Sequence, residues 1–352
     1  MEIRYLKESE KQKTRILWEE AFFEDSDSFQ DYYFSYKVKE NQILAGEESG
    51  KIVSMIHRNP YLLTVGKDRE GNPRLWRSDY LVGVATALNR RGRGCMRKLL
   101  VQCLEDMYRE DMPFCFLMPA DERIYLPFDF TYIFRQPFWK LRDSGQLKKE
   151  KVTKESYKDV AGWMNAWLET QYEVFAKRDE RYLDGLVKEL ESEAGNLYLL
   201  KTQTNTRDEM VGLYAEWGLE KREQRLLYTA ETYRVLEKAE PAIMGRIVAL
   251  SRFVEAIRLK DSIETEEAVF YLHVQDKLLK KNEGPWLWHI NHTSSWLEPT
   301  HRREKVDTLC EIDLPIQELT AWLMGYAVPS SLCSQAEKQI RCLQGVFLDE
   351  IV

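Results

Sequence analysis

Tyr80-Leu-Val-Gly-Val-Ala-Thr-Ala-Leu-Asn-Arg-Arg-Gly-Arg-Gly-Cys-Met-Arg-Lys-Leu-Leu100 is the stretch that decides the fold of this chain. Its first half is apolar and β-branched, which is typical of a buried strand. From Cys95 to about Tyr108 apolar residues recur at helical spacing, which predicts a helix. The turn between them starts at Arg91 and is basic and glycine-bearing. Free N–H groups and the helix dipole at such a turn favour a phosphate, although an ordinary strand-to-helix turn has the same spacing.

The turn does not match two familiar phosphate-binding sequences. No Gly-Lys-Ser/Thr follows it, and no third Gly or Ala follows Gly92 and Gly94 at the dinucleotide spacing. Arg91-Gly-Arg-Gly-Cys-Met resembles motif A of the GCN5-related N-acetyltransferases (GNAT), Gln/Arg-x-x-Gly-x-Gly/Ala. Arg91 and Gly94 match it, whereas Met96 replaces the final small residue. A large residue there is similar to the Eis-like branch of that family.

The elements expected around this stretch have the order of that family's fold. Residues 8–24 have a helical pattern, and the N-cap cluster Asp25-Ser-Asp-Ser starts a second helix. Strand-like runs follow at 41–47, 51–58 and 61–65, and the short apolar run 113–119 is typical of a buried strand. This order predicts an α/β (α+β) fold, with a GNAT domain over residues 1–143.

Two further units are expected. The charged run 146–154 is interpreted as a linker. Residues 144–238 resemble a degenerate GNAT-like domain, and because they contain no Arg-x-x-Gly-x-Gly, no second cofactor site is expected. Residues 239–352 resemble a sterol-carrier-protein-like domain. This third unit is predicted to begin with a helix over 241–257 and to continue with strands and two helices.

The resemblance implies acetyl-CoA as co-substrate, in a gap between strands 82–86 and 114–118. The residues expected to hold it are Val84, Ala85, Thr86, Arg91, Gly92, Arg93, Gly94, Cys95 and Met96. No metal and no acyl-enzyme are expected. The histidines of the last unit, His273, His289, His292 and His301, lack carboxylates or cysteines at ligand spacing and are interpreted as surface or pocket residues.

Tyr125 is the candidate catalytic acid. Ile124-Tyr125 and the short Phe-x-Phe pattern after it resemble the Eis-like segment whose Tyr protonates the departing CoA thiolate. A phenol with an ordinary pKa near 10 is protonated at neutral pH, so it can donate to that thiolate. The alternative is a tyrosine that only packs in a loop.

The last residue is the second candidate catalytic group. The chain ends on an apolar segment, and the resemblance implies that the Val352 carboxylate enters the first domain's site as a base or as an anchor for the substrate ammonium. An α-carboxylate has an ordinary pKa near 3.5, so its pKa must be raised by apolar surroundings if it is to act as a base. A last short strand packed on the third domain is the alternative.

The acceptor cleft is expected to be aromatic and acidic, with walls that include Phe23, Asp25, Tyr33 and Tyr36. Such walls suit the primary amine of a cationic acceptor, and the resemblance implies an aminoglycoside-like or polyamine-like molecule or a protein lysine. Two other classes stay open: a non-catalytic acyl-CoA or lipid-binding protein, and an interaction protein on a GNAT scaffold. Turnover of acetyl-CoA over a panel of amines separates them.

Composition limits the remaining classes. The net charge of −7 over 352 residues argues against a general nucleic-acid binder. No apolar run approaches the roughly 20 residues that span a bilayer. The six cysteines have no regular spacing, so reduced thiols in a cytoplasmic protein are expected. Members of the resembled family are often hexameric, which implies a homo-oligomer.

Overall fold

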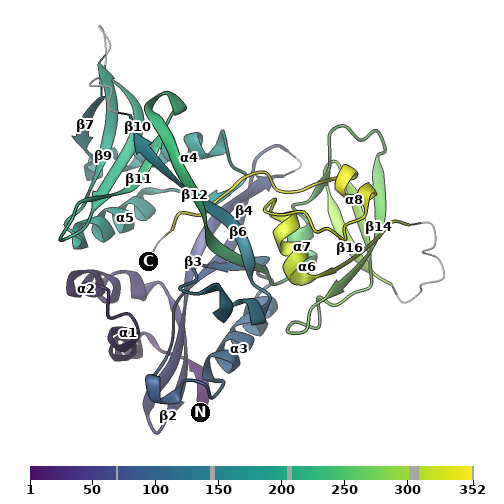
Figure 1. Cartoon of the computed structure of the whole chain (residues 1–352), viewed down its shortest axis with the longest axis horizontal. Helices are drawn as coiled ribbons and strands as arrows, with labels where there is room; N and C mark the ends of the chain where they lie inside the picture. The colour runs from purple at the N-terminus through teal and green to yellow at the C-terminus, as the bar shows by residue number, and fades with distance from the viewer. Residues whose placement is uncertain (69, 143–146, 204–207, 301–308, 351–352) are drawn as a thin grey trace.

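The computed structural model describes residues 1–68, 70–142, 147–203, 208–300 and 309–350 (Figure 1). The described residues form three lobes that follow one another along the chain and meet beside a long central sheet. Helices and strands alternate in the first lobe and mix in the other two, which confirms the expected α/β class.

The first lobe is a sheet with helices on its faces. The expected helix over 8–24 is divided into a 3-10 turn at Glu8–Thr14 and α1 at Arg15–Ala21, and α2 follows at Asp27–Ser35. The sheet has the order β1-β2-β3-β4-β5-β12-β6. Its strands are β1 (Glu2–Tyr5), β2 (Gln42–Glu48), β3 (Lys51–Lys67), β4 (Pro73–Thr86), β5 (Phe114–Leu117), β6 (Thr131–Leu141) and β12 (Arg234–Ile247). The two runs expected at 51–58 and 61–65 are thus one long strand, β3.

The strand-turn-helix unit forms as expected. β4 ends at Thr86, and α3 (Cys95–Arg109) begins directly after Gly94. β4 and β5 run parallel but pair only at Asp79 with Cys115 and at Tyr80 with Phe116. Beyond this point the two strands diverge, so the last residues of β4 have β3 on one side and open space on the other.

Strand β12 corrects the sequence prediction for residues 241–257. The expected helix is a strand up to Ile247, and only α6 (Leu250–Val254) is helical. A short continuous apolar run gives the same pattern in a buried helix and in a buried strand, and the run from Ile243 to Ile247 is buried throughout. β12 lies between β5 and β6, so the boundary expected at 238 and 239 falls inside a strand of the first sheet.

The second lobe is a smaller sheet covered by two helices. The order is β11-β10-β9-β7, and the expected linker is wrong for Leu147–Lys151, which form strand β7 against β9. Lysine-rich sequences are common in edge strands, where the charges disfavour pairing with a strand of another chain. The other elements are α4 (Tyr157–Glu169), β8 (Val174–Ala176), α5 (Glu180–Ser192), β9 (Asn196–Gln203), β10 (Asp208–Trp217) and β11 (Glu223–Thr229).

The third lobe packs a sheet of order β16-β15-β14-β17 against short helices. Cys310 and Cys333 form a disulfide there, so the expectation of reduced thiols is wrong for this pair. No described helix is long and apolar enough to cross a membrane. The elements are β13 (Arg258–Leu259), β14 (Glu267–Gln275), β15 (Trp286–Asn291), β16 (Ser295–Pro299), β17 (Glu311–Pro315), α7 (Ile316–Leu323), α8 (Ser334–Gln339) and β18 (Ile340–Arg341).

The C-terminal segment returns to the first two lobes. In Figure 1 the yellow chain leaves the third lobe and crosses toward them, where β19 (Val346–Phe347) pairs in parallel with β8. β8 also pairs with β3, so this segment joins the first sheet. Asp349 and Glu350 are buried, and both carboxylates contact the guanidinium of Arg178, at 3.1 and 2.5 Å.

Candidate active site

A cleft of about 980 Å³ opens where β4 and β5 diverge. The end of β4, the start of α3 and the segment after β5 form its walls, with α1 on one side. Most of the expected cofactor residues line it, namely Val84, Ala85, Thr86, Arg91, Gly92, Gly94, Cys95 and Met96, together with Tyr125. Arg93 is exposed and is not part of the lining.

A β-bulge shapes the inner wall of the cleft. Met55 pairs with Ala85 and His57 pairs with Val82, so Gly83 and Val84 face a single residue of β3. The extra residue of a bulge is unpaired, and its backbone polar groups are free for another partner. Gly83 has φ +57, and a Cβ there would lie 2.6 Å from the Trp18 ring. Glycine is therefore needed at the bulge for its conformation and for space.

Buried rings support the bulge from behind. Trp18 packs on the Tyr33 ring at 4.2 Å between centroids, and the Tyr33 hydroxyl lies 2.8 Å from His57 Nδ1. The same hydroxyl accepts a hydrogen bond from the Asn41 amide. Burial lowers the pKa of His57 to about 3, so the imidazole is neutral at pH 7. Tyr33 was expected in the acceptor wall, but it is fully buried and belongs to this support.

The turn before α3 fits an anion. Gly92 and Gly94 both have φ +74, and a Cβ on either would meet nothing within 4 Å, so their backbone faces open space. The first helical hydrogen bond at this end runs from the Lys98 N–H to the Gly94 carbonyl, which leaves earlier N–H groups without helical acceptors. The Arg91 side chain turns back to the Thr86 carbonyl at 3.1 Å. Backbone groups, more than arginine side chains, therefore form this part of the cleft.

Tyr125 also lines the cleft and lies between two 3-10 turns, Glu122–Ile124 and Leu126–Phe128. Only 7% of its surface is exposed, and its ring packs edge-on against Phe130. Burial raises the pKa of Tyr125 to about 12. The phenol is therefore protonated at neutral pH and can act as a proton donor into the cleft.

The remaining expected acceptor residues are dispersed. Asp25 lines the cleft and accepts a hydrogen bond from Trp18 Nε1 at 2.8 Å. Phe23 is 79% exposed and lies outside the lining, whereas Tyr36 lines a different pocket. Val352 lies outside the described residues. The four acceptor residues do not form one wall.

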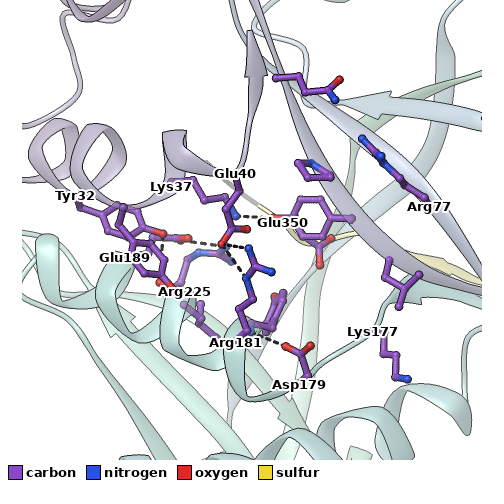
Figure 2. A pocket seen from close by; sticks show the side chains of 18 residues that line it. Tyr32, Lys37, Glu40, Arg77, Lys177, Asp179, Arg181, Glu189, Arg225 and Glu350 are labelled. Atoms are coloured by element: carbon purple, nitrogen blue, oxygen red, sulfur yellow. Dashed lines mark hydrogen bonds and ion pairs between the residues drawn. The ribbon is translucent and has the colours of Figure 1, made fainter. Parts of the chain in front are cut away.

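A second pocket, of about 580 Å³, lies between the first two lobes (Figure 2). It is lined from the α2 end, β3, α5, β11 and the C-terminal segment, and Lys37, Glu189, Arg225 and Glu350 come together in it. These residues are not among those expected from the sequence. No local pattern connects them, because each comes from a different segment of the chain.

The histidines of the third lobe form pairs with carboxylates. His273 Nδ1 lies 3.0 Å from Asp313, and His289 Nδ1 lies 2.7 Å from Glu267 while its ring stacks on Trp296. Within the described ranges no group of His, Cys, Asp and Glu is arranged to hold a metal ion. His301 lies outside those ranges.

Two family models match the chain. Residues 2–133 match an acetyltransferase (GNAT) domain, and residues 250–338 match a sterol carrier protein domain. No curated protein matches it by sequence. The first match contains the bulge, the glycine turn and Tyr125. The chain therefore carries an acetyltransferase domain with its cleft in the expected place.

Solved structures share the whole architecture. A probable N-acyltransferase from Enterococcus faecalis has a TM-score of 0.79 at 15% identity, covering 100% of this chain and 99% of its own. A GCN5-related N-acetyltransferase from Anabaena variabilis has a TM-score of 0.72 at 14% identity, and Eis1 from Mycobacterium abscessus has a TM-score of 0.71 at 11% identity. In both cases 100% of each chain is covered. At these identities the likeness establishes the fold. The chain thus has a GNAT acetyltransferase domain first and a sterol carrier protein domain near the other end, within an overall fold that it shares with these three structures.

Proposed function

We propose that this protein transfers the acetyl group of acetyl-CoA directly to a primary amine. The observation that carries the proposal is the presence in one cleft of the β4 bulge, the glycine turn before α3 and the buried Tyr125. These parts match the three needs of the reaction: a polarised thioester carbonyl, a bound pyrophosphate and a proton donor for the thiolate. The acceptor class that the sequence favours, a cationic amine or a protein lysine, stays a prediction.

The donor is held mainly by backbone in this proposal. The free N–H groups around Gly92, Gly94 and Cys95 face the pyrophosphate, which helix N-termini bind well. The bulge at Gly83 and Val84 directs backbone amides toward the thioester carbonyl, where negative charge develops as the amine attacks. The gap between β4 and β5 takes the pantetheine chain in place of a neighbouring strand.

The chemical step needs one proton removed and one supplied. A neutral amine attacks the thioester carbonyl carbon, the carbon–sulfur bond breaks, and Tyr125 gives its proton to the leaving sulfur. The amine has to lose a proton to bulk water, to Asp25 or to the predicted base Val352. No covalent enzyme intermediate is required, because the amine reacts with the thioester itself.

The test is acetyl-CoA turnover, followed as free thiol, over a panel of primary amines, with the product identified by its mass. Gly92→Val places a branched side chain in the cleft and should raise the KM for acetyl-CoA about tenfold or more, because several N–H contacts to phosphate are lost. Gly71→Val is the matched control, since Gly71 also has positive φ and open space around it but lies in a distant turn.

Acetyl-CoA binding measured by calorimetry separates the alternatives. Tight binding without turnover on any amine would favour a non-catalytic acyl-CoA-binding protein. Failure to bind acetyl-CoA, or equal KM values for the two glycine variants, would contradict the donor site itself.

A further inference from the structure

The second pocket contains charges of both signs. An acidic wall for a simple cation would contain negative charges alone. Among the described residues that line it, Lys37, Arg77, Lys177, Arg181 and Arg225 are basic, and Glu40, Asp179, Glu189 and Glu350 are acidic. Some of these charges satisfy one another. Arg181 binds Glu40 at 2.5 Å. Arg225 and Glu189 lie 3.6 Å apart, an ion-pair contact that is too long for a hydrogen bond, so each keeps hydrogen-bonding capacity for a ligand. The others indicate what the pocket can bind.

Two buried carboxylates have an oxygen that accepts no hydrogen bond from the described residues. Glu350 is 3% exposed, and its Oε1 accepts from Arg178 at 2.5 Å while Oε2 has no hydrogen-bond partner among the described residues. Glu189 is also buried, and its Oε1 accepts no hydrogen bond from the described residues. Burial raises the pKa of both carboxyls. A buried acceptor left unpaired costs free energy, so a ligand N–H donor at this end is favoured.

Lys37 supplies the opposite charge. Its ammonium contacts the Tyr61 hydroxyl at 3.3 Å, and no carboxylate of the described residues lies within ion-pair distance of it. Burial lowers the pKa of Lys37, which an anionic ligand would reverse. Arg225 Nε also lacks an acceptor in the described chain. Figure 2 shows Lys37 near the Glu350 end of the pocket and Arg225 beside Glu189, with Arg77 and Lys177 farther along.

The pocket adjoins the donor cleft. Tyr61 lines the pocket and Tyr80 lines the cleft, and their rings pack at 6.3 Å between centroids. Both rings also pack on Phe116. A molecule held in the pocket by one end therefore lies one layer of aromatic side chains from the site of transfer.

We propose that the second pocket binds the zwitterionic head of the acceptor, with an ammonium on Glu350 and Glu189 and a carboxylate on Lys37 and Arg225. The inference rests on the proposed function, because it assigns the acceptor class for that reaction: an amine whose far end is an amino-acid head group. Such an acceptor can carry net positive charge, yet it is distinguished from a polyamine by its carboxylate.

Three probes of similar length test each half of the head group. L-lysine carries both charges beside its side-chain amine, 1,5-diaminopentane is lysine without the carboxylate, and 6-aminohexanoate is lysine without the α-ammonium. A hydrogen bond to a charged group is worth about tenfold to a hundredfold in affinity. We expect kcat/KM for acetyl transfer to be highest for lysine and lower by at least about tenfold for each partial probe.

Matched variants assign the preference to the pocket. Lys37→Met should lower kcat/KM for lysine about tenfold and leave 1,5-diaminopentane within about twofold, because only lysine offers a carboxylate to Lys37. Glu350→Gln should reduce the advantage of lysine over 6-aminohexanoate. Lys39→Met is the control: it removes the same charge two residues away, from an exposed side chain outside the pocket.

The outcomes keep this inference apart from the proposed function. Transfer that prefers 1,5-diaminopentane, or a lysine preference unchanged in both variants, would overturn the zwitterion assignment and leave the acetyltransferase intact. If no amine is acetylated, calorimetry with L-lysine still decides. Binding that weakens in Lys37→Met and not in Lys39→Met supports the pocket, and absence of binding overturns it.

Discussion

The donor cleft and the second pocket are built in different ways. About half of the residues that line the cleft come from one continuous stretch, 80–96, which contains the bulge and the glycine turn, and the others come from α1, the residues just after it and the segment after β5. The second pocket is made of charged side chains from separate segments, brought together by the packing of two lobes and the C-terminal segment. The cleft thus needs glycine and a bulge, whereas the pocket needs particular charged groups held in place.

This difference determines how each site responds to substitution. A backbone site is expected to tolerate changes of side chain but to be sensitive where a Cβ would alter the chain path. A side-chain site is sensitive to the loss of a single charge, because partners left behind are buried. The following predictions test that contrast.

The largest effect is expected at Tyr125, the proposed acid of the cleft. Tyr125→Phe should lower kcat by about 10²–10⁴-fold, the usual contribution of a positioned acid. Because burial raises the pKa of Tyr125 to about 12, the wild-type kcat should show no alkaline loss from this group up to about pH 10. Tyr108→Phe, a half-buried tyrosine of α3 outside the cleft, is the control. An unchanged kcat in Tyr125→Phe would remove the acid from the mechanism.

The second prediction concerns the charges that hold the pocket together. Arg178→Met leaves the buried Asp349 and Glu350 carboxylates without their cation and should lower the free energy of unfolding by about 3–5 kcal/mol. Arg181→Met is the matched control, because the 68% exposed Arg181 side chain should contribute under about 1 kcal/mol through its pair with Glu40. Denaturant unfolding of both variants measures the difference. Similar losses would mean that the C-terminal segment is not held by Arg178.

The same contrast explains what the sequence could predict. The strand, turn and helix over 80–100 follow from local periodicity and glycine placement, and so does the order of elements up to Leu117. Tyr125 was singled out because Ile124-Tyr125 and the short Phe-x-Phe pattern after it resemble the Eis-like segment, and its catalytic role stays a prediction. These features depend on residues close together in the chain, where pattern and structure are directly linked.

Tertiary pairing decided the features that the sequence left open. The apolar run 241–247 has a pattern that also fits a helix. It is a strand because it pairs with β5 on one side and with β6 on the other. The lysine run 147–151 is a strand because β9 pairs with it. Tyr33 is an aromatic residue of the kind that lines ligand clefts, but it is buried and its hydroxyl contacts His57. The second pocket left no local signal at all.

The third prediction tests the backbone of the cleft. Gly83→Ala places a Cβ 2.6 Å from the Trp18 ring at φ +57, and should cost about 2–4 kcal/mol of unfolding free energy, from overpacking and from the positive φ. Gly50→Ala has φ +75 with nothing within 4 Å, so it should cost only about 1 kcal/mol. Denaturant unfolding gives both values. If Gly83→Ala is also normal in acetyl-CoA turnover, the bulge does not hold the thioester.

The smallest effect is a pH dependence that belongs to the support behind the bulge. The pKa of His57 is lowered to about 3 by burial, against 6.5 for the ordinary group. Below pH 6.5 the unfolded chain binds a proton that the folded chain does not, so the stability contributed by neutral His57 is complete above that pH and is lost as the pH falls toward 3. Between pH 7 and pH 5 this amounts to about 2 kcal/mol.

His57→Asn removes the titrating group while keeping an acceptor for the Tyr33 hydroxyl. On going from pH 7 to pH 5, the unfolding free energy of the variant should therefore fall by about 2 kcal/mol less than that of the wild type. This difference does not depend on how stable the variant is at pH 7. Unfolding curves at the two pH values measure this, and all other titrating groups cancel in the comparison. Equal losses in both proteins would show that folded His57 takes up its proton with a pKa near the ordinary 6.5. The Trp18, Tyr33 and His57 support would then contain a buried cation at pH 5, and the bulge that it holds would depend on charge as the second pocket does.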